Sequence, residues 1–134
     1  MKLPKSVTLK MNRGVLVEDK KFIFLPYDKE KSVEVEEGYV IDNYLTKDMG
    51  MGHSLVRSHL NGKHPRMKNV GQNRTYYFIN GSGEFVVEGE RVKVKEGDVL
   101  VIPKNTIYEF EGVFDAILIS CPGFDPKDDV IYRD

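Results

Sequence analysis

The sequence predicts an all-β fold, an antiparallel jelly-roll barrel of the double-stranded β-helix type. Three observations support this prediction. No window of the chain shows a long helical period. Short apolar stretches are separated by Gly, Pro, Asn and Asp along nearly the whole chain. Turn signals recur about every 8–12 residues, which is typical of a sandwich or barrel. About ten strands with hairpin turns suit a jelly roll.

In the N-terminal part of the chain, residues 1–60, we expect strands punctuated by short polar turns. Residues 33–36 alternate apolar and polar side chains, as a half-buried strand does. A plausible hairpin turn, Glu18-Asp19-Lys20, separates the first two strands, and Pro26 ends the second. The expected strands are 14–17, 21–25, 33–36, 39–45 and 54–60.

The C-terminal half carries the clearest strand pattern. Residues 63–73 contain Pro65 and are predicted to form a loop. Six strands should follow, at 75–80, 83–87, 91–94, 98–102, 107–111 and 113–120, with Glu88-Gly89 as a tight hairpin turn. Alternation gives each strand one apolar face, as in the pairs Phe85 and Val87, Val92 and Val94, Val99 and Val101. Residues 121–134 should form a polar tail.

Composition and length limit the function classes. The chain has 134 residues, enough for one domain spanning 1–134, with residues 74–120 as its core. A formal net charge of -1 gives no electrostatic case for nucleic acid or an anionic membrane. The apolar runs are too short to cross a bilayer. With no apolar signal region after the first residues and one cysteine, Cys121, we expect a cytoplasmic protein.

Two turn patterns in residues 76–110 resemble a known family. Gly81 closes a strand and turn that read Tyr77-Phe78-Ile79-Asn80-Gly81-Ser82-Gly83-Glu84. Further on, Gly97, Pro103 and Asn105 have the spacing of a second motif, and Asn105 replaces a Gly because Asn tolerates positive φ. Together these residues resemble the cupin superfamily, whose RmlC-like members are small jelly-roll barrels. The resemblance covers the C-terminal half best.

The resemblance also implies that the usual cupin metal site is missing. Most cupin enzymes hold a metal with a His-any-His pair and a Glu in the first motif, and with a His that ends the second. Here the pair falls near Met67 to Val70, the Glu position holds Arg74 and the last His position holds Tyr108. Arg is a permanent cation with donors only, so it repels a metal ion. We therefore predict no metal and no cofactor. His53, His59 and His64 match no common zinc spacing either.

The same register points to candidate ligand-binding residues inside the barrel. Arg74 is either an anchor for an anionic ligand or a partner in an internal salt bridge. Tyr76 and Phe78 share its face by alternation, and Tyr108 joins them from the second motif. Aromatic rings with a polar tip suit a sugar or a small aromatic ligand, and core filling is the alternative role.

Further candidates lie before the first motif. Arg57 and His59 alternate on one face of their predicted strand, and His64 and Asn69 fall in the predicted loop, where they could rim a pocket. In sugar epimerases of the superfamily a His paired with a carboxylate removes a proton. His59 is the strand His available for that role, although a structural His is the alternative. Cys121 shows no catalytic pattern.

Two functions remain open. The first is a metal-independent small-molecule-binding cupin whose ligand is polar and anionic, such as a sugar phosphate, a sugar nucleotide or a carboxylate. The second is a metal-independent sugar isomerase or epimerase that uses His59 or Tyr108 as its proton-transfer group. In either case we expect a homodimer, because the N-terminal strands could cover a sheet edge of a partner.

Overall fold

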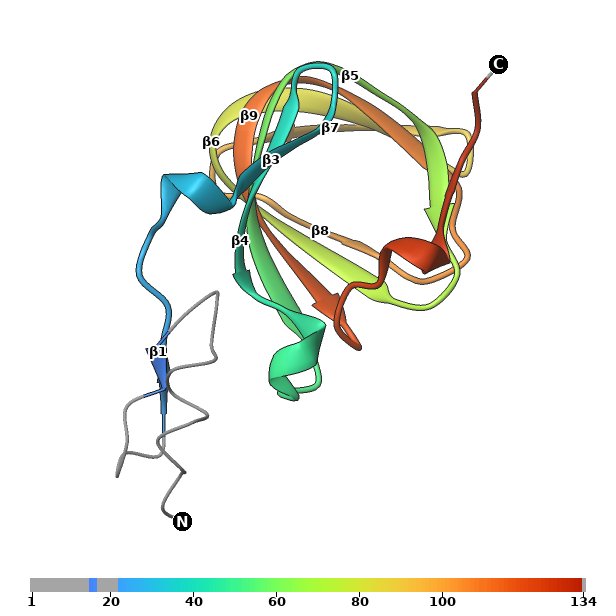
Figure 1. Ribbon diagram of the computed structural model, residues 1–134. Coiled ribbons are helices and arrows are strands. Elements are labelled where there is room, and N and C mark those ends of the chain that lie inside the picture. Colours follow the sequence, from blue (N-terminus) through green and yellow to red (C-terminus); the bar gives the residue numbers. More distant parts are fainter. Residues whose placement is uncertain (1–14, 17–21, 134) are drawn as a thin grey trace.

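The chain folds as an antiparallel β-barrel, which confirms the predicted fold class (Figure 1). The computed structural model describes residues 15–16 and 22–133. Three short 3₁₀ helices, Lys29–Lys31, Lys47–Met49 and Pro126–Asp128, interrupt the strands. The strands are β1 (Val15–Leu16), β2 (Ile23–Phe24), β3 (Ser32–Glu36), β4 (Tyr39–Leu45), β5 (Ser54–Asn69), β6 (Asn73–Val87), β7 (Glu90–Lys95), β8 (Val99–Ile102), β9 (Tyr108–Cys121) and β10 (Asp129–Ile131).

One sheet contains all the barrel strands. Its order is β3-β4-β5-β9-β6-β7, with β8 paired to β6 and β10 paired to β5. The long strands β5, β9 and β6 form the continuous wall, and their pairing runs from Ser54 opposite Ser120 to Val87 opposite Tyr108. The sheet curves around an interior, and every second residue of each strand points its side chain into it.

Tight turns occur where the sequence motifs predict them. Gly81 and Gly97 have φ values of 76° and 90°, and Asn105 has a φ of 68°. Glu88 and Gly89 both have positive φ, as a two-residue hairpin requires. The interpretation of Asn105 as a stand-in for Gly is therefore confirmed.

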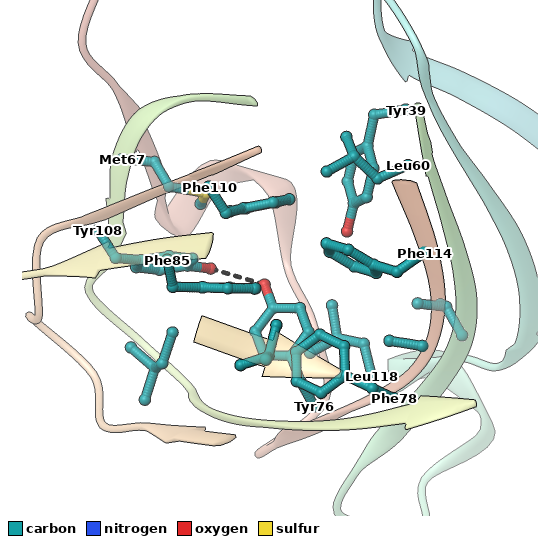
Figure 2. Close-up of a cluster of buried hydrophobic side chains, with 14 residues drawn as sticks. Tyr39, Leu60, Met67, Tyr76, Phe78, Phe85, Tyr108, Phe110, Phe114 and Leu118 are labelled. Carbon is teal, nitrogen blue, oxygen red and sulfur yellow. Dashed lines mark hydrogen bonds between the residues drawn. The ribbon is translucent and has the colours of Figure 1, made fainter. Parts of the chain in front are cut away.

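Aromatic side chains fill one end of the barrel. Figure 2 shows Tyr76, Phe78, Phe85, Tyr108, Phe110 and Phe114 pointing toward one another. Phe85 lies 4.7 Å from Phe110 and Phe78 lies 5.1 Å from Phe114, between ring centroids. Such offset and edge contacts each add to the free energy gained from burying the rings. The predicted alternation of Arg74, Tyr76 and Phe78 toward the interior is confirmed, because all three are buried.

The structure corrects several predicted segments. Residues 63–69 are not a loop: β5 continues through them to Asn69. Pro65 is accommodated because the pairing of β5 with β9 shifts register between His64 and Met67. The predicted pairs of strands at 75–87 and 107–120 are single bent strands, β6 and β9. On β8, Ile102 is buried and Leu100 is partly buried against the core, whereas Val99 and Val101 are exposed on the outside.

The expected polar tail is also wrong for most of its length. Residues 122–133, which we call the C-terminal strap, turn back along the barrel, and β10 pairs with Asn69, Lys68 and Met67 of β5. Figure 1 shows this segment in red along the lower right side of the barrel, leading to the C-terminus. The strap therefore belongs to the wall around the interior.

The N-terminal predictions can be assessed only in part. β1 and β2 pair antiparallel as expected, but the turn Glu18-Asp19-Lys20 lies outside the described residues. Among the residues that the structure describes, there is no helix with the length and apolarity to cross a membrane. The homodimer, the cytoplasmic location and the single-domain division stay predictions from the sequence.

The close approach of β6 to β9 at Gly81 generates a stability prediction. A Cβ at residue 81 would lie 2.1 Å from the Val113 carbonyl oxygen, whereas a Cβ at Gly89, also at positive φ, would meet nothing within 4 Å. We expect Gly89→Ala to cost about 1 kcal/mol for its backbone conformation alone. Gly81→Ala should cost at least about 2 kcal/mol more, because the strands must separate. Urea unfolding of both variants measures this, and equal costs would contradict it.

Candidate functional site

A cavity of about 950 Å³ occupies the end of the barrel that the aromatic cluster leaves open. Its wall combines the strap with strands β3, β4, β5, β6 and β9. This volume is within the range of small-molecule sites. The side chains that matter chemically in its wall are Tyr39, His64, Arg74, Tyr76, Phe124 and Asp129.

Arg74 is the buried cation of this cavity. Its side chain is 6% exposed, and its Nη2 donates to Asp129 Oδ1 at 2.9 Å. Its Nη1 donates to the Tyr108 hydroxyl at 3.0 Å, and its guanidinium lies 5.3 Å from the centre of the Phe124 ring. Burial would lower the pKa of Arg74, but the surrounding hydroxyls and the Asp129 carboxylate raise it overall. Of the two predicted roles, the geometry favours the internal salt bridge.

A chain of hydroxyls connects Arg74 to the aromatic cluster. The Tyr108 and Tyr76 hydroxyl oxygens lie 3.0 Å apart, as the dashed line in Figure 2 marks. Tyr108 is 1% exposed and does not line the cavity, whereas Tyr76 does. Burial raises the pKa of Tyr76 well above its usual value, so this hydroxyl stays protonated at neutral pH. Tyr108 can therefore reach a ligand only through Tyr76 or Arg74.

The C-terminal strap is fastened over the cavity by ion pairs with the barrel. Asp125 pairs with Lys47 at 2.9 Å, Asp129 pairs with Arg74, and Arg133 pairs with Glu36. The strap also holds β5 and its connection to β6, because Asp128 accepts a hydrogen bond from Gln72 at 2.7 Å. A segment with this many anchors has a defined position relative to the cavity.

His64 presents a free ring nitrogen near Arg74 and Tyr39. Its Nδ1 lies 2.8 Å from the Pro65 carbonyl oxygen, which can only accept, so Nδ1 carries the hydrogen of the neutral ring. Nε2 then keeps its lone pair and has no hydrogen-bond partner within residues 22–133. Burial lowers the pKa of His64, and the Arg74 charge acts in the same direction. The ring stacks on Phe110 at 4.7 Å, which fixes its orientation.

His59 and Arg57 lie on the other face of β5, outside the barrel. Ser58 and Leu60 are buried in the interior, and the residues that alternate with them point outward. His59 Nε2 is 2.8 Å from Asp42 and its Nδ1 is 3.0 Å from Asp115, which also accepts from Arg57 at 2.9 Å. Neither residue lines the cavity. Both ring nitrogens of His59 are engaged, so it has no free base to offer.

The network around His59 shifts three pKa values. Burial alone would lower the pKa of His59, but the hydrogen bonds and charges of Asp42 and Asp115 outweigh it and raise the pKa. Burial would raise the pKa of both carboxyls, yet hydrogen bonds lower both, chiefly from His59 to Asp42 and from Arg57 to Asp115. This outer cluster therefore favours the protonated form of the His59 imidazole, which lies between two carboxylates.

The predicted site residues separate into three groups. Arg74, Tyr76 and His64 line the cavity together. Tyr108 and Asn69 lie behind its wall; Asn69 donates to Asp129 Oδ1 at 2.8 Å. Arg57 and His59 lie outside. Sequence reasoning missed Asp129, Phe124 and Tyr39, and no signal in a polar tail could have assigned Asp129 to a cation 55 positions earlier.

The donor set does not fit the metal that many cupins carry. At the ligand positions of the two motifs stand Arg74, which is cationic, and Tyr108, whose hydroxyl accepts from Arg74. No cluster of three or more His, Cys, Asp or Glu side chains with metal-binding geometry occurs in the described part of the chain. A divalent ion at this point would face a fixed guanidinium rather than imidazoles and a carboxylate.

Comparisons with known proteins agree with this architecture. The family model described as a cupin domain matches residues 55–120. The chain belongs to the cupin superfamily. An uncharacterized protein of Aquifex aeolicus is 28% identical over 109 residues, which cover 76% of this chain and 84% of that protein.

Two solved structures extend the comparison. Pac13 of Streptomyces, a nucleoside dehydratase, is 26% identical with a TM-score of 0.69, and the match covers 81% of this chain and 90% of Pac13. Pac13 variants have been solved with uridine, two with a tyrosine replaced by phenylalanine and one with a histidine replaced by glutamine. KdgF of Halomonas, at 18% identity, 75% and 96% coverage and a TM-score of 0.65, shares the fold.

The raised pKa of His59 predicts a specific pH dependence of stability. A group whose pKa is higher in the folded state stabilises the fold below the unfolded pKa of about 6.5, and this contribution is lost as pH rises through the folded value. As the pH rises above about 6.5, we expect the free energy of unfolding to fall more steeply in the wild type than in His59→Gln. Replacing His59 also changes the titration of Asp42 and Asp115, but their pKa values are lowered and lie below this pH range, so identical pH profiles above about pH 6.5 would contradict the prediction.

Proposed function

We propose that this cupin binds a small, polar, ring-containing molecule in the barrel cavity and transfers a proton on it without a metal. The observation that carries this proposal is the free Nε2 of buried His64, which lines the same cavity as Tyr76 and Arg74. A neutral imidazole is a suitable general base, and a protonated hydroxyl in the same cavity is a suitable donor.

The comparison with Pac13 supports a nucleoside as the candidate ligand. The residue types replaced in the uridine-bound variants, one histidine and two tyrosines, are the types that this chain gathers in His64, Tyr76 and Tyr108. The aromatic and polar wall would also suit a flat base and a sugar. Lyase and isomerase steps both need a base for a carbon-bound proton and a donor for an oxygen.

The proposal modifies both functions that the sequence left open. His64 replaces His59 as the base, because His59 lies outside the cavity with both nitrogens engaged. Tyr108 becomes a positioning residue behind Tyr76 and Arg74. A binding module without catalysis is the second candidate, and it is favoured by one observation: Arg74, Tyr108 and Tyr76 are already hydrogen-bonded in a chain.

Calorimetric titration with uridine in the presence of EDTA tests the binding half of the proposal. We expect binding that EDTA does not weaken. His64→Gln should lose about tenfold in affinity, the effect of one hydrogen bond. His59→Gln is the matched control, since it makes the same change on the outer face of the same strand, and it should bind as the wild type does. Absence of binding, or equal losses in both variants, would refute the proposal.

Proton transfer is tested separately in D₂O. The protein is incubated with a panel of nucleoside and sugar aldehydes and ketones, and NMR follows deuterium uptake at the carbon next to the carbonyl. The wild type and His59→Gln should exchange this proton with at least one member of the panel, and His64→Gln should not. Binding without exchange by the wild type would leave the binding module as the function.

A further inference from the structure

Every cation in the cavity wall already has a carboxylate partner. Arg74 pairs with Asp129, Lys47 with Asp125 and Arg133 with Glu36, while Asp48 adds a further carboxylate to the wall. Four carboxylates thus face three cations in the described lining. With His64 neutral, the wall offers an anionic ligand no unpaired positive charge.

Only one of these pairs has a buried cation. The side chains of Lys47 and Arg133 are 56% and 64% exposed, so either can turn away from its partner toward solvent or a ligand. Arg74 is buried between Tyr108, Phe124 and Asp129 and has no such freedom. The charge at the inner end of the cavity therefore depends on Asp129.

Asp129 has an acceptor to spare. Its Oδ1 receives hydrogen bonds from Arg74 at 2.9 Å and from Asn69 at 2.8 Å, and it sits opposite Asn69 in the pairing of β10 with β5. Its Oδ2 has no hydrogen-bond partner among residues 22–133, although a carboxylate oxygen can accept two. An anion that is held by one oxygen and lines the cavity can accept a hydrogen bond from a ligand with the other.

We propose that Asp129 determines the class of ligand. It neutralises the Arg74 guanidinium in an ion pair, and it accepts a hydrogen bond from a ligand hydroxyl or amide. The cavity then admits uncharged nucleosides or sugars and rejects their phosphorylated forms. This inference rests on the proposed function and goes beyond it, since it replaces the anionic ligand expected from Arg74 with a neutral one. A phosphate that approaches Arg74 would meet a carboxylate that cannot leave, and like charges in a partly buried site repel strongly.

Uridine and uridine 5′-monophosphate are the matched probes. In calorimetric titrations at constant ionic strength, the wild type should bind uridine at least about tenfold more tightly than the monophosphate. Asp129→Asn keeps the shape and the oxygen that Arg74 and Asn69 use, but removes the negative charge. This variant should gain at least about tenfold in affinity for the monophosphate, because a carboxylate no longer neutralises the Arg74 charge or repels the phosphate.

Asp128→Asn is the control for net charge. Asp128 lies next to Asp129 on the strap but binds Gln72 and does not line the cavity, so its substitution should leave the preference for uridine unchanged. If Asp129→Asn fails to fold, Arg74→Gln/Asp129→Asn removes both charges together. That double variant should lose the discrimination against the monophosphate without reversing it.

The outcomes separate the two proposals. If the wild type binds uridine but takes the monophosphate equally well, the role of Asp129 is refuted and the proposed function stands. If neither compound binds, the proposed function itself fails. A wild-type preference that persists in both Asp129 variants would also refute the inference, since another group would then exclude the phosphate.

Discussion

The ion pair between Arg74 and Asp129 is the interaction on which the rest of the cavity depends. A guanidinium that is 6% exposed has to find an anion within the fold, because an unpaired buried charge costs several kcal/mol. Its partner comes from the far end of the chain, so satisfying Arg74 requires the strap to cross the barrel. The same contact brings Phe124 onto the guanidinium and forms one wall of the cavity. It also fixes a cation at the position where the motif resemblance expects a metal-binding Glu.

The barrel has two ends of different character because its interior side chains differ along the strands. Toward Phe78, Phe85 and Phe114 the interior is packed solid with aromatic rings. Toward the strap, polar groups remain, and several are hydrogen-bonded to a neighbour: Tyr76 to Tyr108, and Tyr108 to Arg74. The aromatic end supplies rigidity, which lets the polar groups hold fixed positions around open space.

Local features of the fold could be predicted from sequence, and long-range ones could not. The turns at Gly81, Gly97 and Asn105 follow from residues that tolerate positive φ, and the inward row Arg74, Tyr76 and Phe78 follows from strand alternation. The residues of β5 beyond Gly62 were mistaken for a loop because Pro65 is a strong turn signal, and a register shift that tolerates it leaves no mark in the sequence. Pairing of Arg74 with Asp129 depends on the path of the strap, which no local pattern records.

Which residues of β5 point into the barrel matters most for the chemistry of the cavity. Ser54 and Ser58 face the interior while Leu55 does not, so hydrophobicity alone gives no clear inward face for this strand. Because side chains alternate between the two faces of a strand, a residue's position in this alternation decides its surroundings and therefore its chemistry. His64 lies on the same face of β5 as Ser58 and Leu60, so its side chain points into the cavity. There burial lowers its pKa, and its Nε2 remains free. His59 lies on the outer face and contacts two carboxylates, which raise its pKa and form hydrogen bonds with both ring nitrogens. The pKa values of two histidines on one strand are thus shifted in opposite directions, and only His64 has a free ring nitrogen that can act as a base on a molecule inside the barrel.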